Sequence, residues 1–194
     1  MVKDVCYGSL FDKKDIPLLH KYAQKVRETH DQELVNNFNM MCEAKFNDKH
    51  PVLMVGDKEI EPIQVSKADD LVVTAGLDQS INQILGTSVV RWQYMAKGTG
   101  TTTPAAGNTA LVTEVLPRVD MSLYGWREYA GASLRFAGIF GESVTGIVVR
   151  ECGIFTTSTV GTMLNRNVFL PPITHQQLGD GFVISCIIEF VPVV

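Results

Sequence analysis

The chain has 194 residues, of which 45% are hydrophobic and 20% charged, and its formal net charge is −4 at pH 7. This composition is typical of a globular protein with one domain, or one domain and an arm. The acidic balance argues against a broad basic surface for nucleic acid. No apolar run reaches the roughly 18 residues that membrane insertion needs. No charged-then-apolar leader opens the sequence, so we expect no secretory signal.

Charged residues are dense before residue 70 and thin out after it. We therefore predict an N-terminal helical arm with an extended connector, residues 1–69, and a β domain, residues 70–194. Apolar residues recur at helical spacing within residues 12–46, where Asp15 and Pro17 fit a helix start. The polar stretch RETHDQE leaves open whether this segment is one helix or two.

The apolar stripe of the arm is too narrow to bury itself. Such a stripe packs either on the parent domain or on a neighbouring subunit, and both alternatives stay open. After the helical part, residues 47–69 predict a short strand, VLMV, a Gly-Asp turn and the connector. The candidate interface residues on the stripe are Leu34, Phe38 and Met41.

The β domain opens with an apolar run and a short helix that we expect to end at Gly86. The residues at helical spacing are Leu77, Ile81, Ile84 and Leu85. Five or six later runs alternate like strands between Gly- or Pro-containing turns, which predicts a mainly β fold, an antiparallel β-sandwich of jelly-roll type. The last run, GFVISCIIEFVPVV, is apolar on both faces, so we expect it in the middle of a sheet or against a partner.

The stretch KGTGTTTPAAGNTAL, residues 97–111, could be a phosphate cradle or a loop between strands. A P-loop places Gly-Lys-Ser/Thr after its glycines, whereas Lys97 precedes them here. A dinucleotide-binding turn needs a third glycine, but Thr103 stands at that position and Pro104 disfavours a helix. We interpret the stretch as a long inter-strand loop.

The four cysteines are far apart and form no C-x-x-C pair, which argues against zinc and against a redox dithiol. We expect Cys6, Cys42, Cys152 and Cys186 to be buried, reduced thiols of a chain that folds in a reducing cytoplasm. A Cys152–His175 dyad is the alternative for one of them, but a cysteine among Val and Ile is more often a small core residue.

The sequence gives no positive signal for an enzyme. It has no G-x-S-x-G elbow, and its histidines form neither H-x-x-x-H nor H-E-x-x-H. Acidic residues are available for glycosidic chemistry, but their spacing in the fold is not readable from the sequence. We therefore predict a non-enzymatic protein with no catalytic, cofactor-binding or metal-binding residues.

Two further groups of residues suggest contacts. Arginines beside apolar strand residues are expected to pair with acids at a sheet rim or a subunit boundary; this group is Glu114, Arg118, Arg150, Glu151 and Arg166. The segment SLYGWREYAG holds Tyr124, Trp126 and Tyr129, and the sequence leaves open whether they are buried or exposed. If exposed, they would be anchors of a protein interface or stacking platforms for sugar rings. Trp92 and Tyr94 are expected to pack in the core.

An ordered set of short motifs follows residue 71: VVTAGLDQSINQILG, YMAKGTG, EVLPR, ECGIF, MLNRNVF and a Gly-Asp-Gly before the last β run. This order resembles that of the β-rich structural proteins of tailed-bacteriophage virions, in tail, baseplate and fibre-attachment positions. The resemblance covers about residues 71–194. Residues 1–70 show no such likeness.

What the resemblance implies is assembly rather than catalysis. It implies a structural subunit of the tail, neck or baseplate that is made in the bacterial cytoplasm and contacts copies of itself and other virion proteins. One alternative is a capsid decoration or cement protein. Another is a carbohydrate-binding module for host attachment, whose partner would be a host-surface glycan.

Overall fold

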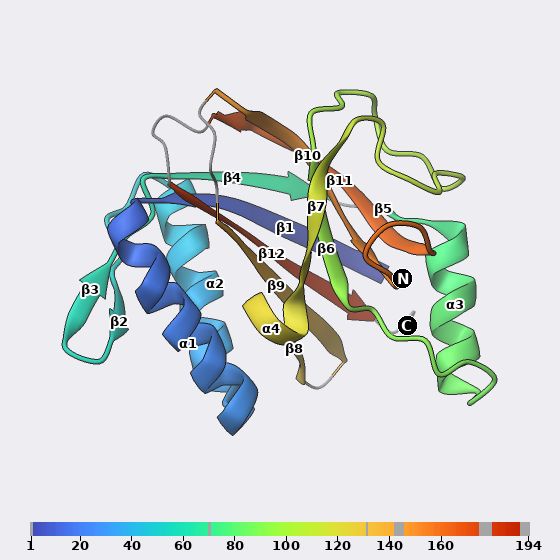
Figure 1. The fold of residues 1–194 in the computed structure, drawn as a ribbon, viewed down its shortest axis with the longest axis horizontal. Helices are drawn as coiled ribbons and strands as arrows, with labels where there is room; N and C mark the ends of the chain where they lie inside the picture. Colours follow the sequence, from blue (N-terminus) through green and yellow to red (C-terminus); the bar gives the residue numbers. More distant parts are fainter. Residues whose placement is uncertain (1, 70, 131, 142–145, 175–179, 191–194) are drawn as a thin grey trace.

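One antiparallel sheet of ten strands curls into a nearly closed barrel (Figure 1). The computed structural model describes residues 2–69, 71–130, 132–141, 146–174 and 180–190. From edge to edge, the strands are β7 (Glu114–Asp120), β6 (Tyr94–Gly98), β10 (Val148–Phe155), β11 (Met163–Thr174), β4 (Gln64–Asp69), β1 (Val2–Phe11), β12 (Gly181–Phe190), β9 (Ser133–Gly141) and β8 (Gly125–Ala130). The short strand β5 (Leu71–Val72) pairs with β11 beside this path.

The two edges of the sheet lie near each other. The short helix α4 (Met121–Tyr124) joins the edge strands β7 and β8 directly, and β6 and β7 also contact β9 across the remaining gap. The mainly β, antiparallel character predicted from the sequence is confirmed. The jelly-roll sandwich is not confirmed, because these strands form one curled sheet rather than two separate ones.

The predicted N-terminal helical arm is also not confirmed, because β1 and β4 are inner strands of the sheet. The β1–β12 ladder pairs all ten residues of β1, from Val2 opposite Phe190 to Phe11 opposite Gly181. Side chains alternate across a strand, so Cys6 and Leu10 lie in one buried cluster while Tyr7 and Phe11 lie in another. Both faces of this N-terminal segment are therefore covered by its own chain.

Two helices cover the outer face of β1, β8 and β9 (Figure 1). They are α1 (Ile16–Thr29), which follows the 3₁₀ turn Lys13–Asp15, and α2 (Gln32–Phe46). The chain turns between them at His30, whose φ is 52°, and the Asp31 carboxylate accepts the Glu33 N–H at 2.8 Å to cap α2. The polar stretch RETHDQE therefore contains a break between two helices, which answers the question of one helix or two that the sequence left open. The hairpin β2 (Leu53–Val55) and β3 (Lys58–Ile60) follows, with the expected Gly-Asp turn between its strands.

The last strand, β12, lies between β1 and β9, as expected for a run that is apolar on both faces. Its alternate residues enter two cores. The barrel interior contains, among others, Met95, Phe136, Phe140, Phe169, Phe182 and Ile184. The core between sheet and helices contains, among others, Leu19, Tyr22, Phe38, Trp126, Ala137 and Val183.

The expected short helix is α3 (Thr74–Ile84), and Gly86 follows it with a φ of 70°. It packs beside β11 through Gly76, the one buried residue of the helix. A Cβ atom at this position would lie 2.7 Å from the Cα atom of Leu164, so only glycine permits this close approach.

Candidate functional site

A buried carboxylate holds the loop that follows β6. Glu151 on β10 is fully buried, and its side-chain oxygens accept backbone N–H groups from Gly100 at 3.0 Å, Val112 at 3.1 Å and Thr113 at 2.8 Å. The same carboxylate accepts the Arg166 Nε–H at 2.9 Å. Both ends of the loop are thereby fixed to one side chain.

Arg166, also fully buried, extends this network to the middle of the loop. Its guanidinium donates to the Thr102 carbonyl at 2.9 Å and to the Asn108 side-chain oxygen at 3.3 Å. A buried ion pair is stable only when further hydrogen bonds satisfy both groups, and the loop supplies these bonds. The Gly- and Thr-rich stretch therefore forms an inter-strand loop that covers the Glu151–Arg166 ion pair and is hydrogen-bonded to it.

This geometry also explains the glycines. A Cβ atom at Gly98 would lie 2.7 Å from a Glu151 side-chain oxygen, and one at Gly100 would overlap the same carboxylate. The backbone N–H groups that could have bound a phosphate are directed at an internal carboxylate instead.

A second ion pair lies at the edge strand β7. Arg118 donates to both carboxylate oxygens of Glu114, at 2.6 and 2.9 Å, and its guanidinium carbon lies 3.5 Å from the ring centroid of Phe155. It also donates to the carbonyls of Thr157 and Val160 at 3.0 and 3.1 Å. The arginine thus fixes the β10–β11 connection to β7. Arg150, the remaining arginine of the predicted group, is half-buried on β10 and belongs to neither of these two pairs.

The structure buries three of the six residues predicted to form an interface. Phe38, Met41 and Trp126 lie in the core under the helices, with the rings of Phe38 and Trp126 at 5.0 Å and nearly perpendicular. Leu34 packs partly buried against the same core. The apolar stripe of α1 and α2 packs on the sheet of its own chain rather than on a neighbouring subunit. This answers the question that the sequence left open. Of the predicted aromatic cluster, Tyr124 and Tyr129 are exposed while Trp126 is not.

Three cysteines predicted as separate thiols meet inside the barrel. Cys6 on β1 and Cys186 on β12 form a disulfide, and they are direct partners in the strand register. Cys152 on β10 remains a thiol, and the three sulfur atoms all lie within 4.8 Å of one another. The expectation of four reduced thiols is wrong for Cys6 and Cys186, because the register places their Cα atoms 4.1 Å apart, which no sequence spacing reveals. Cys42 is a buried thiol in the other core.

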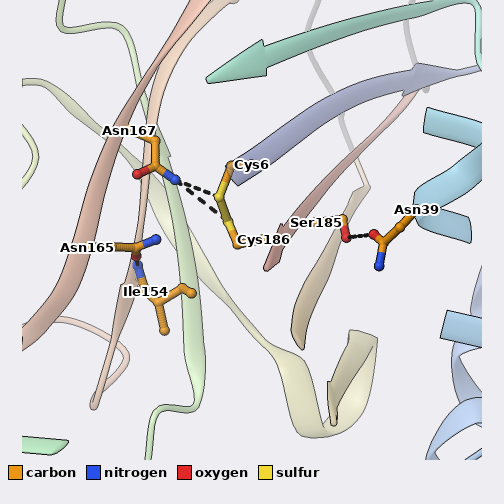
Figure 2. Close-up of a disulfide and its surroundings, with 7 residues drawn as sticks. All are labelled: Cys6, Asn39, Ile154, Asn165, Asn167, Ser185 and Cys186. Atoms are coloured by element: carbon orange, nitrogen blue, oxygen red, sulfur yellow. Dashed lines mark hydrogen bonds between the residues drawn. A yellow bond between two sulfur atoms is a disulfide. The ribbon is translucent and has the colours of Figure 1, made fainter. Parts of the chain in front are cut away.

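Polar groups surround this sulfur cluster, defined as Cys6, Cys152 and Cys186. The Asn167 amide nitrogen points at the disulfide, 2.5 Å from Cys6 Sγ and 3.8 Å from Cys186 Sγ (Figure 2). On the neighbouring strand β6, Lys97 stands directly opposite Cys152 in the register. Lys97 is only 3% exposed, its ammonium lies 4.9 Å from the ring centroid of Phe140, and burial lowers its pKa to about 8.

An exposed apolar face runs along α3 and the segment after it. Its most exposed side chains are Ile84 at 80%, Leu85 at 68% and Val89 at 92%, and Ile81 is 52% exposed one helical turn earlier. We call this set, with Leu77 and Val90, the α3 face. Apolar side chains gathered on one exposed face mark an interaction surface more often than single exposed ones do.

No family model, no curated protein and no solved structure matches the chain. None of the described helices is both long and apolar enough to cross a membrane. His175, the suggested partner of Cys152, lies outside the described residues, so the Cys–His dyad has no geometry to support it.

Two features of these sites escaped the sequence reading. The sulfur cluster joins residues up to 180 positions apart, and only the strand order brings them together. The burial of Lys97 could be predicted in part, because Met95 and Lys97 lie on the same face of a strand and Met95 is apolar. That alternation could have indicated a buried lysine.

Proposed function

We propose that this protein is a non-enzymatic structural subunit of a bacteriophage virion, in the tail, neck or baseplate, that assembles with copies of itself through the α3 face. The observation that carries the proposal is the exposure of Ile84, at the end of α3, and of Leu85 and Val89 in the segment that follows it. The ordered motifs of residues 71–194, which resemble those of phage virion proteins, support the same assignment.

The physical basis for assembly differs from the one that the sequence suggested. The sequence placed the surplus apolar surface on the last strand and the helical arm, but β12 is an inner strand and both helices cover the sheet. The surplus lies instead on α3, where Gly76 is the only buried residue. At about 25 cal/mol for each Å² of apolar area, covering this face would favour association.

A second copy of the chain is the occupant that the charges favour. Asp78 is the only charged residue in TAGLDQSINQI, the sequence of α3. An isologous contact places the same surface patch on both subunits, so like charges on the patch would repel each other. On α3 itself, Asp78 is the single residue that would add this repulsion when the α3 face meets its own copy.

The exposed tyrosines bear on the glycan-binding alternative. Tyr129 is 72% exposed on the edge strand β8, and Tyr124 is 51% exposed on α4. Both could stack on sugar rings, whereas the expected third platform, Trp126, is buried. A capsid decoration protein would use the α3 face in the same way on a different partner, and adding the purified chain to undecorated capsids separates that role from one in the tail.

Native mass spectrometry and sedimentation velocity of the whole chain test self-assembly. Concentrations of about 1–100 µM cover the dissociation constants of weak complexes. We expect a homo-oligomer, and we expect Ile84→Asp to shift it to monomer by raising the dissociation constant at least about tenfold. Val160→Asp is the matched control, because Val160 is 81% exposed on a different loop. A wild-type monomer throughout the range, or equal dissociation by both variants, would refute self-assembly through this face.

A further inference from the structure

The sulfur cluster contains a disulfide and a third sulfur within reach of it. Cys6, Cys152 and Cys186 are all fully buried, and their sulfur atoms lie within 4.8 Å of one another. A thiolate that contacts a disulfide can displace one of its sulfurs and form a new disulfide. The cluster therefore contains the reacting groups of an exchange reaction within one protein chain.

The positions of the strands make the two possible linkages different in kind. Cys6 and Cys186 join β1 to β12, which are already hydrogen-bonded neighbours. Cys152 is on β10, which two other strands, β11 and β4, separate from β1 in the sheet order. A disulfide from Cys152 would cross the barrel interior and connect walls that share no backbone hydrogen bonds.

We propose that the sulfur cluster is a site of internal disulfide exchange, in which the Cys152 thiolate attacks Cys186 Sγ. The Cys152–Cys186 bond forms, the Cys6–Cys186 bond breaks, and Cys6 leaves as a thiolate that takes up a proton. One disulfide and one thiol are present before and after, so the step consumes neither an oxidant nor a reductant.

Asn167 determines which sulfur leaves. Its amide N–H donates to Cys6 Sγ at 2.5 Å and lies farther from Cys186 Sγ, at 3.8 Å. A hydrogen bond to the charged form of a group stabilises that form, and a stabilised thiolate is the better leaving group. Cys6 is therefore the sulfur that departs and Cys186 the sulfur that is attacked.

Lys97 provides the proton transfer that the exchange needs. It stands opposite Cys152 on the adjacent strand, and directly opposite residues have Cβ atoms about 5 Å apart. Burial lowers the pKa of Lys97 to about 8, so the neutral amine is accessible near neutral pH. The amine can accept the Cys152 proton and return it to the departing Cys6 sulfur, which keeps the net charge of the interior unchanged.

The consequence is a change in what holds the N-terminal strand. Before exchange, β1 is bonded covalently to β12; after exchange, β1 is held by hydrogen bonds and packing, and β12 is bonded to β10 instead. The sheet order stays the same in both states.

Disulfide mapping of the whole chain tests the exchange. Native protein is equilibrated at pH 8, quenched in acid, labelled with an alkylating reagent under denaturing conditions and digested at low pH before mass spectrometry. We expect peptides with Cys6–Cys186 and peptides with Cys152–Cys186, with Cys6 labelled in the second population. If Cys6–Cys186 were the sole linkage found and Cys152 were fully labelled, the proposal would be overturned. An excess of the Cys6–Cys152 linkage over Cys152–Cys186 would overturn the role of Asn167.

Variants make the test independent of the position of that equilibrium. Cys6→Ser, refolded in a glutathione buffer and shown by circular dichroism to be folded, should contain Cys152–Cys186 in at least about half of the molecules, because no other partner is near. Cys42→Ser is the matched control and should reproduce the wild-type map, since Cys42 lies in the other core. Two results would contradict the exchange. One is folded Cys6→Ser in which the alkylating reagent labels both Cys152 and Cys186. The other is a wild-type protein that forms no disulfide and instead binds one equivalent of zinc in its reduced state.

Discussion

At the scale of single residues, the Glu151–Arg166 pair determines the conformation of the loop after β6. Glu151→Gln would leave the Arg166 charge buried without its counter-charge, and breaking a buried pair on one side typically costs about 3–5 kcal/mol. We expect a loss of that size in the free energy of unfolding, measured by urea denaturation. Glu61→Gln is the control: its pair with Lys45, at 2.7 Å, is partly exposed, so the loss should stay below about 1 kcal/mol.

The comparison of these two variants also tests the description of the loop. If the loop is fixed through Glu151, the variant should expose the backbone amides of Gly100 and Thr113 to rapid hydrogen exchange, since both donate to that carboxylate. Equal stability losses in Glu151→Gln and Glu61→Gln, with these amides still protected, would show that the carboxylate does not fix the loop.

The sequence indicated these residues but not their arrangement. It marked Arg166 as a member of a structural ion pair because this arginine stands beside apolar strand residues, with Glu114 or Glu151 as the expected partner. Pairing between them depends on the β10–β11 register, in which Gly153 stands opposite Arg166 and a bulge follows. Such irregularities leave no periodic signal in the sequence, so the loop could be recognised as a loop but its ion pair could not.

At the scale of elements, α3 approaches β11 closely at Gly76. Gly→Ala in an exposed helix interior usually stabilises by up to about 1 kcal/mol, but a Cβ at Gly76 would overlap the backbone of Leu164 on β11. We therefore expect Gly76→Ala to destabilise the protein by about 1–3 kcal/mol, the usual cost of overpacking. Thermal unfolding by circular dichroism measures this, and a stabilised variant would show that α3 does not rest on β11.

Because the α3 face is the proposed contact between copies, Gly76→Ala has a second expected effect. A displaced helix should weaken association as Ile84→Asp does, even though Gly76 itself is buried. Ser80→Ala, on the same helix, is the control; it removes one hydrogen bond to the Gly76 carbonyl and should leave association unchanged. Unchanged association of a destabilised Gly76→Ala would separate the contact from the position of the helix.

Helices and strands with a regular spacing of apolar residues could be predicted from the sequence. Strands whose apolar pattern is interrupted could not. The helix α3 and the inner strand β12 follow directly from their apolar spacing. By contrast, β1 reads VKDVCYGSLF and β4 reads QVSKAD, and charged or small residues interrupt their apolar pattern. Strands of this kind are stabilised by their neighbours rather than by their own composition, so the sequence suggested an arm where the fold has two inner strands.

At the scale of the whole molecule, closure of the sheet brings distant residues into one interior. A sandwich and a curled sheet share the same alternation along each strand, so the sequence alone could not distinguish them. The difference lies in which strands become neighbours, such as β1 beside β12. The same closure creates the sulfur cluster, which has no local signal, and buries Lys97, whose local signal is its alternation with the apolar Met95.

Burial of Lys97 makes the stability of the whole molecule depend on pH. Its pKa is about 8 in the folded chain against 10.5 for an ordinary lysine, so between these values the unfolded chain binds more protons than the folded one. Stability then rises with pH, by at most about 1.4 kcal/mol per pH unit. Below pH 8 both states are protonated, and the full cost of burying the charge is present.

The matched comparison is Lys97→Met, studied in a Cys152→Ser background so that the thiol opposite Lys97 does not titrate. We expect the methionine variant to be the more stable protein at pH 7, and its advantage to shrink as the pH rises from 8 to 9.5, measured by urea denaturation. Other titrating groups cancel because both proteins contain them, including Cys42, whose pKa burial raises to about 12. An advantage that stays constant across this range would mean that Lys97 keeps its ordinary pKa, and that the barrel interior admits enough water to solvate its charge.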